Sequence, residues 1–169
     1  MSITIESDVW KGKRGWRLAS EVSLSAPLDE VFPFFSRAHN LNELTPPSLP
    51  FRILTPEPIE MAEELLIEYR LRVKGMPVRW TSEISVWNPP HRFVDEQKRG
   101  PYRWWHHEHV FEPTDGGTIA RDVVHYGVLG GALVHSLVVK RDLMTIFTYR
   151  HRKMIELFGL LSPQPNNPS

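Results

Sequence analysis

Residues 65–87 read LLIEYRLRVKGMPVRWTSEISVW, two alternating stretches on either side of a tight turn. Apolar residues recur at every second position: Leu65, Ile67, Tyr69, Leu71 and Val73 before the turn, and Val78, Trp80, Ile84 and Val86 after it. This period of two is typical of strands with one buried face. A turn this short cannot hold a crossover connection, so the two strands are predicted to pair antiparallel.

The same pattern extends in both directions from this hairpin. Between Phe51 and Tyr126, turn signals rich in Gly, Pro and Asn separate six candidate strands, which predicts an antiparallel meander. Residues 15–25 also alternate and form the first predicted strand. Two short helices are expected after it. One starts in residues 25–32 and is bent or shortened by Pro33, and the other covers residues 38–44.

The pattern changes to a helical one after the glycine pair at 130–131. Apolar residues then recur at steps of three and four up to Phe158, and Gly159 provides the stop. The stripe comprises Leu133, Leu137, Met144, Phe147, Met154 and Phe158, with Lys140 and His151 on the same face. A long helix over residues 133–158 is therefore predicted.

Composition narrows the class of protein. The chain has 169 residues, 20 basic and 20 acidic side chains and no cysteine. A neutral chain is not a dedicated nucleic-acid binder, and one without cysteine has no disulfide or thiolate chemistry. The first 13 residues lack the apolar run of an export signal, and the apolar stretch 126–139 is shorter than the about 20 residues of a membrane helix. We expect a cytoplasmic protein without stable membrane insertion, with one domain over residues 1–161 and a disordered tail over 162–169.

Four segments, in this order, resemble a known superfamily: SAPLDEVF at 25–32, WNPPHRF at 87–93, GPY at 100–102, and FEP followed by GGT at 111–118. The chain resembles the START-like or Bet v 1-like (SRPBCC) superfamily, and within it the bacterial polyketide cyclase/dehydrase and coenzyme Q-binding branch. The resemblance implies an α+β helix-grip fold, in which a curved antiparallel sheet of about seven strands wraps around the long C-terminal helix. It also implies a cavity between sheet and helix for a lipid, isoprenoid or polyketide-like ligand, without a cofactor.

The most unusual stretch is RWWHHEHVF at residues 103–111. On a strand, Trp105, His107, His109 and Phe111 share one face, and the opposite face contains Glu108. Because a carboxylate marks the side in contact with water, we expect the odd-numbered residues to face the cavity. On the neighbouring strand 119–126, the even-numbered set faces inward, which places Asp122 near His107 or His109. Asp95 is a second candidate acid.

Three interpretations of these polar residues are open. Two histidines at i and i+2 with a carboxylate are ligand types that Zn or Fe prefers, but the motif is weak and the resembled family does not generally depend on metal. His107 or His109, oriented by Asp122, could instead be the general acid or base of a cyclase or aromatase. The interpretation we favour is a hydrogen-bonded group that orients a ligand without reaction, with no metal bound.

The predicted ligand-binding set adds side chains that would form the cavity wall: Tyr69, Trp80, Trp105, Phe111, Tyr126, Met144, Phe147 and His151. The basic residues of the long helix could contact anionic membrane lipids during ligand exchange, but we assign them to its solvated surface: Lys140, Arg141, Arg150, Arg152 and Lys153.

Binding of a small hydrophobic ligand is the predicted function, and the sequence leaves ligand identity and oligomeric state open. A cyclase-type enzyme is one alternative, and a protein-interaction or stress-response module with a small, filled cavity is another. A phosphate-binding loop, a nucleophile elbow and a zinc-protease helix motif are all absent from the sequence, so hydride and phosphoryl transfer are not expected.

Overall fold

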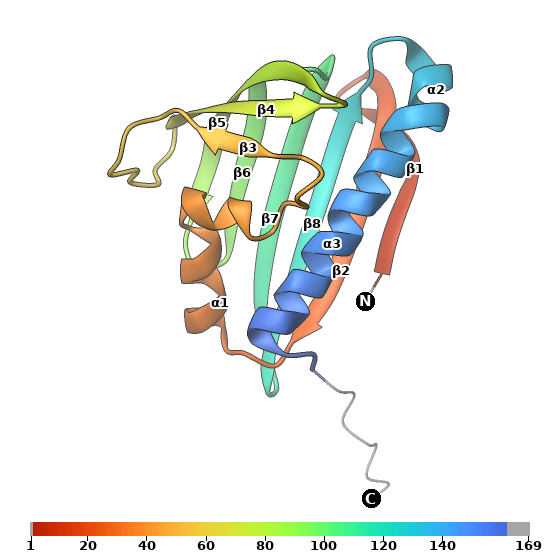
Figure 1. Cartoon of the computed structure of the whole chain (residues 1–169). Helices are drawn as coiled ribbons and strands as arrows, with labels where there is room; N and C mark the ends of the chain where they lie inside the picture. Colours follow the sequence, from red (N-terminus) through yellow and green to blue (C-terminus); the bar gives the residue numbers. More distant parts are fainter. Residues whose placement is uncertain (1, 162–169) are drawn as a thin grey trace, which may run out of the picture.

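The computed structural model describes residues 2–161 and has an α+β architecture (Figure 1). All sheet pairs are antiparallel, in the order β1-β2-β8-β7-β6-β5-β4-β3. The strands are β1 (Ser2–Trp10), β2 (Lys13–Leu24), β3 (Phe51–Ile53), β4 (Leu66–Val73), β5 (Met76–Asn88), β6 (Arg92–Arg99), β7 (Trp104–Thr114) and β8 (Gly117–Gly127). The predicted meander is confirmed as the run from β3 to β8.

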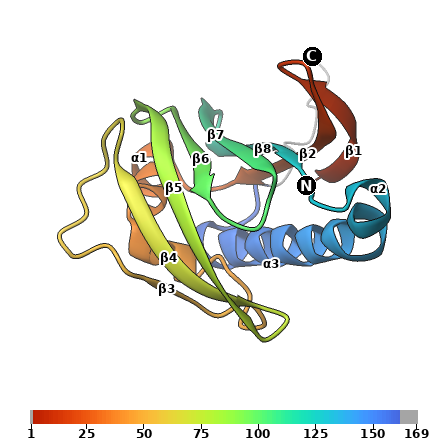
Figure 2. The ribbon, with the colours of Figure 1, turned by 90° about the horizontal axis from the view of Figure 1, so that it is seen from above.

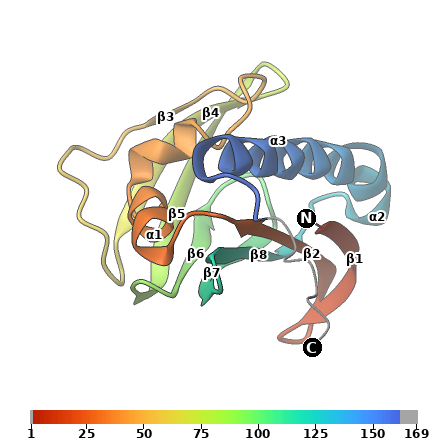
Figure 3. The same ribbon diagram turned by 90° about the horizontal axis from the view of Figure 1, so that it is seen from below.

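The helices lie on the concave side of the curved sheet, and the longest crosses it (Figures 2 and 3). They are α1 (Leu28–Phe35), the 3-10 helix η1 (Ala38–Asn42), α2 (Gly131–Val134), the π-helix η2 (His135–Val139) and α3 (Lys140–Phe158). The last three follow one another without a break, so the predicted long C-terminal helix and the helix-grip fold are confirmed. Helix α1 passes through Pro33 and ends two residues later.

The sheet has eight strands where about seven were predicted. The additional strand is β1, which pairs with β2 through a turn at Lys11 and Gly12, both at positive φ. Ile3 and Ile5 pack against the core, Trp10 stacks on Trp104, and Val9 is exposed. Polar and apolar side chains alternate in this segment, which is the pattern of a strand. The predicted tail at 162–169 lies outside the described residues.

The apolar stripe of the long helix is displaced at its beginning. Leu133 and Leu137 are 71% and 69% exposed, so these two members of the stripe do not pack against the sheet. Leu137 lies within the π-helix η2, and the wider turn of this helix rotates the residues of α3 relative to those that precede it. In α3 the buried side chains are Leu143, Phe147, Arg150, His151 and Met154.

The C-terminal end of α3 is attached to the sheet by main-chain hydrogen bonds. The amides of Ser25 and Ala26 donate to the carbonyls of Gly159 and Phe158, and the Leu161 amide donates to Ser23. Gly159 has φ 72°, a conformation that a residue without a side chain adopts at low cost. This clasp fixes the end of the helix against the start of α1. Among the described residues, no helix is long and apolar enough to span a bilayer.

A buried histidine links the π-helix to the sheet. His135 stacks on Trp16 with ring centroids 3.9 Å apart, and the Tyr126 hydroxyl lies 3.0 Å from His135 Nε2. Burial, with a smaller effect of the Lys140 charge, lowers the pKa of His135. The neutral ring therefore accepts a hydrogen bond from the Tyr126 hydroxyl.

This arrangement predicts a pH-dependent contribution to stability. The unfolded chain takes up a proton on His135 as the pH falls through 6.5, whereas the folded chain resists, so the stability from this site is complete above that pH and lost below it. We expect the difference in unfolding free energy between the wild type and His135→Gln to fall from about pH 7.5 to about pH 5.5 in urea titrations. The contributions of the other histidines to the pH dependence cancel in this difference, because both proteins contain them. A difference independent of pH would contradict the role assigned to His135.

Candidate functional site

A cavity of about 600 Å³ lies between the concave face of the sheet and the helices. Its wall is mostly apolar and is formed by β4 to β7, η1 and α3. Seven of the predicted ligand-binding residues line it: Tyr69, Trp80, Asp95, Trp105, His107, His109 and Phe147.

The other five predicted residues lie outside this wall. Phe111 is covered by Phe32 and Phe35 of α1 and belongs to the aromatic core. Tyr126 and His151 are fully buried and bonded to other side chains, the latter through Ser20 Oγ at 2.6 Å. The remaining two residues, Asp122 and Met144, are also absent from the lining. An inward direction on a strand or helix is therefore not sufficient to place a side chain on the cavity wall.

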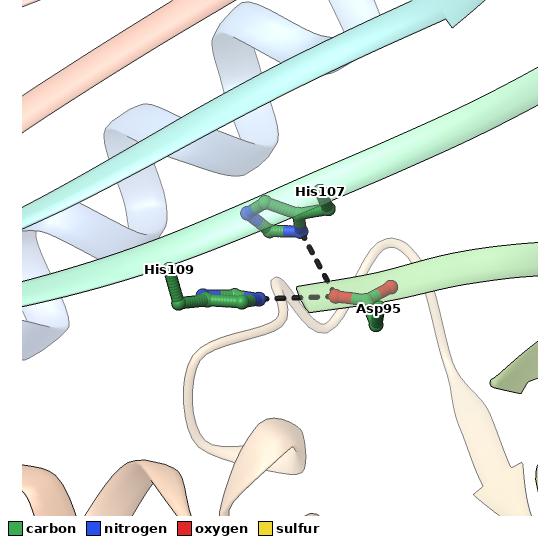
Figure 4. Close-up of side chains that lie close together, drawn as sticks. All are labelled: Asp95, His107 and His109. Atoms are coloured by element: carbon green, nitrogen blue, oxygen red, sulfur yellow. Dashed lines mark hydrogen bonds and ion pairs between the residues drawn. The ribbon is translucent and has the colours of Figure 1, made fainter. Parts of the chain in front are cut away.

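Strand pairing brings the polar residues together on the concave face. Asp95 of β6 is opposite His107 of β7, and His109 of β7 is opposite Asp122 of β8. His107 and His109 are two positions apart on one strand, so both project to the same side. Figure 4 shows both imidazoles directed at the Asp95 carboxylate.

Each imidazole of the pair lies between two carboxylates. Asp95 Oδ2 is 3.0 Å from His109 Nε2 and 3.4 Å from His107 Nδ1. Asp122 Oδ1 is 2.9 Å from His109 Nδ1 and 3.0 Å from His107 Nε2. The two rings lie against each other with centroids 3.8 Å apart. All four ring nitrogens therefore face carboxylate oxygens.

Arg150 completes the cluster and corrects the sequence-based assignment. Its side chain is buried, lines the cavity and places Nη2 3.1 Å from Asp122 Oδ1, so its prediction as a solvated residue was wrong. A buried carboxylate requires a cationic partner, which explains why the arginine is on the inner face. Its position three residues after Phe147 and four before Met154 was the available signal. Arg150 Nε has no hydrogen-bond partner among the described residues.

The charges of the cluster follow from these contacts. Burial acts to raise the pKa of Asp122, but the Arg150 charge and the bonds from both histidines lower it well below its usual range. The pKa of Asp95 is lowered because the two histidines outweigh its burial. Both carboxylates are therefore ionised.

The two histidines differ in their affinity for a proton. Burial and the neighbouring His109 charge lower the pKa of His107. Burial also acts on His109, but its hydrogen bonds to Asp122 and Asp95 raise the pKa of that ring. His109 is thus the ring that holds a proton more readily, and His107 is the ring on the cavity wall that releases one more readily.

Further polar groups are beside the cluster. The indole Nε1–H of Trp80 donates to Ser82 Oγ at 2.9 Å, and Ser82 is near Asp95. Burial raises the pKa of Tyr69 well above its ordinary value, so its hydroxyl remains a neutral donor. Ser82 was not predicted, because a serine between apolar residues of a strand has no distinctive pattern. Together these groups can hydrogen-bond the polar end of a ligand.

Comparisons with known proteins place the fold. No protein-family model matches the sequence, and no curated protein matches it. Among solved structures, protein Ms6760 from Mycobacterium smegmatis is 17% identical with a TM-score of 0.64, over 92% of this chain and 99% of that one. Protein CV1439 from Chromobacterium violaceum is 13% identical with a TM-score of 0.67, over 85% and 97%.

Ara h 8.0201 is a third similar structure, with 16% identity and a TM-score of 0.56 over 83% of this chain and 97% of that one. At such identities the likeness concerns the fold and does not extend to activity. Together with the eight-stranded sheet and the long C-terminal helix, these similarities show that the chain has a Bet v 1-like helix-grip fold.

Proposed function

We propose that this protein binds a small hydrophobic molecule in its cavity and orients the polar end of that molecule on the cluster of Asp95, His107, His109, Asp122 and Arg150. The supporting observation is a largely apolar cavity of about 600 Å³ whose wall includes four members of this polar cluster, namely Asp95, His107, His109 and Arg150. Ligand sites have this composition, in which apolar burial supplies affinity and a few polar groups supply orientation.

A flat, partly aromatic ligand suits this wall best. Trp80 and Trp105 meet edge to face with centroids 5.5 Å apart, and Tyr102 contacts both rings. Rigid aromatic rings offer large contact areas at low entropic cost. This composition supports a polyketide-like or isoprenoid-quinone ligand, as the resemblance to the cyclase and coenzyme Q-binding branch implied. Carriage or sensing of such a molecule requires no further group.

A cyclase or aromatase activity is the second candidate, and one contact favours it. The neutral His107 ring is on the cavity wall, and Asp122 orients it through Nε2. A base near its working pH and held by a carboxylate can remove a proton adjacent to a carbonyl. Turnover of a polyketide-like substrate would distinguish this candidate from simple binding. The interaction-module alternative predicted a small, filled cavity, which the observed volume does not favour.

A matched pair of probes tests the binding proposal. We expect metal-free protein to bind 2-naphthol more tightly than naphthalene, measured by quenching of tryptophan fluorescence. His107→Asn should lower the affinity for 2-naphthol about tenfold, because a hydrogen bond to its hydroxyl is lost. The affinity for naphthalene should change by less than about twofold.

Trp105→Leu is the control for the apolar wall and should weaken both probes alike. Equal losses of both probes in His107→Asn would refute the orienting role of the cluster. Failure of the wild type to bind either probe would argue against the cavity as a site for flat aromatic molecules.

A further inference from the structure

Three donor atoms converge on the cavity wall. Asp95, His107 and His109 each offer one such atom, and the three atoms lie within 4.8 Å of one another. Asp95 Oδ2 is the oxygen that approaches Nδ1 of His107 and Nε2 of His109. The carboxylate oxygen is 3.4 Å and 3.0 Å from the two nitrogens. Donors about 2.1 Å from a metal ion, at angles of about 90–110°, are themselves about 3.0–3.4 Å apart. The two observed distances from Asp95 Oδ2 are therefore those expected between neighbouring ligand atoms of one metal ion.

The opposite ring nitrogens have the partners that metal-bound histidines require. His107 Nε2 and His109 Nδ1 both lie within hydrogen-bond distance of one oxygen, Asp122 Oδ1. If both donate to it, the two remaining nitrogens present lone pairs toward Asp95. A carboxylate behind a histidine fixes its tautomer and strengthens it as a ligand. Arg150 holds that carboxylate in place from the helix.

Three acceptors directed at one point need a cation between them. Two imidazole lone pairs and a carboxylate oxygen repel one another unless a proton or a metal ion lies at their centre. Each donor is on a different residue of two paired strands, which keeps the three atoms together. The side chains are shielded from bulk water but line the cavity, so a bound ion would be reached through it.

We propose that Asp95, His107 and His109 form a binding site for a divalent transition metal, with Asp122 as the residue that positions both imidazoles. Two histidines and one carboxylate suit Zn²⁺ or Fe²⁺, whereas Mg²⁺ and Ca²⁺ prefer all-oxygen sites. Three protein ligands leave coordination positions free on the cavity side. Those positions would accept water or an oxygen of a cavity ligand, such as a hydroxyl or a carbonyl.

The expectation of no metal rested on the weakness of an isolated His-x-His pair. The fold supplies what the pair lacks: a third donor from β6 and a shared positioning carboxylate from β8. The metal site goes beyond the ligand-binding function, and the 2-naphthol test in metal-free protein is independent of it.

Cobalt is a suitable probe, because Co²⁺ in a nitrogen and oxygen site absorbs visible light and Zn²⁺ does not. Full-length protein, freed of metal with EDTA, is titrated with Co²⁺ near neutral pH. We expect one Co²⁺ per chain with visible absorption bands, which Zn²⁺ then abolishes by displacement. Asp122→Asn should lower the affinity for Co²⁺ about 10- to 100-fold, and the stoichiometry should remain one ion per chain.

The control for the ligands is on the same strand. His106 faces the other side of the sheet, where its Nδ1 is 2.8 Å from Glu96, so His106→Ala should bind Co²⁺ like the wild type. His107→Ala, His109→Ala and Asp95→Asn should each abolish stoichiometric binding, and circular dichroism identifies which of them are folded. Absence of Co²⁺ binding in the wild type, or unchanged binding in a folded His109→Ala, would overturn the site.

Discussion

Replacing Arg150 with methionine is expected to lower the free energy of unfolding by about 3–5 kcal/mol. The variant keeps most of the apolar length of the side chain but leaves Asp122 without its guanidinium partner, 3.1 Å away. The contacts of Asp122 with His107 and His109 remain, but no group replaces the guanidinium charge beside the buried carboxylate, which makes the loss costly. Urea titration of both proteins near neutral pH measures the difference.

Two further variants show whether the loss is electrostatic. Arg152 is on the same helix, is 65% exposed and lies 3.8 Å from Glu156. Arg152→Met should change stability by less than about 1 kcal/mol. Adding Asp122→Asn to Arg150→Met should restore part of the loss, because it removes the uncompensated charge. If Arg150→Met cost no more than Arg152→Met, the buried ion pair would not stabilise the fold.

Replacing Phe111 with alanine should also lower the free energy of unfolding by about 3–5 kcal/mol. The ring is 1% exposed and contacts three other phenylalanines, namely Phe32, Phe35 and Phe93. Its removal leaves a void in a cluster that α1 closes from one side. Because Phe111 is not on the cavity wall, the folded variant should bind 2-naphthol like the wild type.

The measurement combines urea titration with probe binding under conditions in which the variant is folded. Trp105→Leu is the comparison variant. The Trp105 ring lines the cavity, so its loss should lower the affinity for 2-naphthol. Weakened binding by a folded Phe111→Ala would return Phe111 to the ligand-binding set that its strand position suggested.

The direction of a side chain on a strand can be predicted from the local sequence, whereas the residues that pack against it cannot. Strand parity correctly indicated the direction of His107 and His109, because the intervening Glu108 marked the solvent side. Antiparallel pairing then placed both carboxylates beside them. These features depend only on the alternation within a strand and on the pairing of strands that follow one another in the chain. Both can be predicted from the sequence.

The remaining features depend on which elements pack together. Phe111 faces inward as expected, but α1 covers it, and no property of its own strand indicates this. Arg150 has the composition of a surface residue, and only the facing Asp122 explains its burial. Leu137 lies in the π-helix and is exposed, because this wide turn changes the phase of the helix between its beginning and α3. Tertiary contacts decided each of these outcomes.

The hydrogen bonds around Gly159 fix the long helix at its C-terminal end, so any tilt of the helix would turn about that end. Arg150 lies about 12 Å from Phe158 along the axis, and Gly131 lies about 40 Å from it. A tilt about the clasp therefore moves the α2 end about three times as far as the guanidinium. The cavity borders Leu129 and Val134 near that distant end. A tilt of the helix would therefore alter the width of the cavity beside Leu129 and Val134 more than the position of Arg150 in the polar cluster.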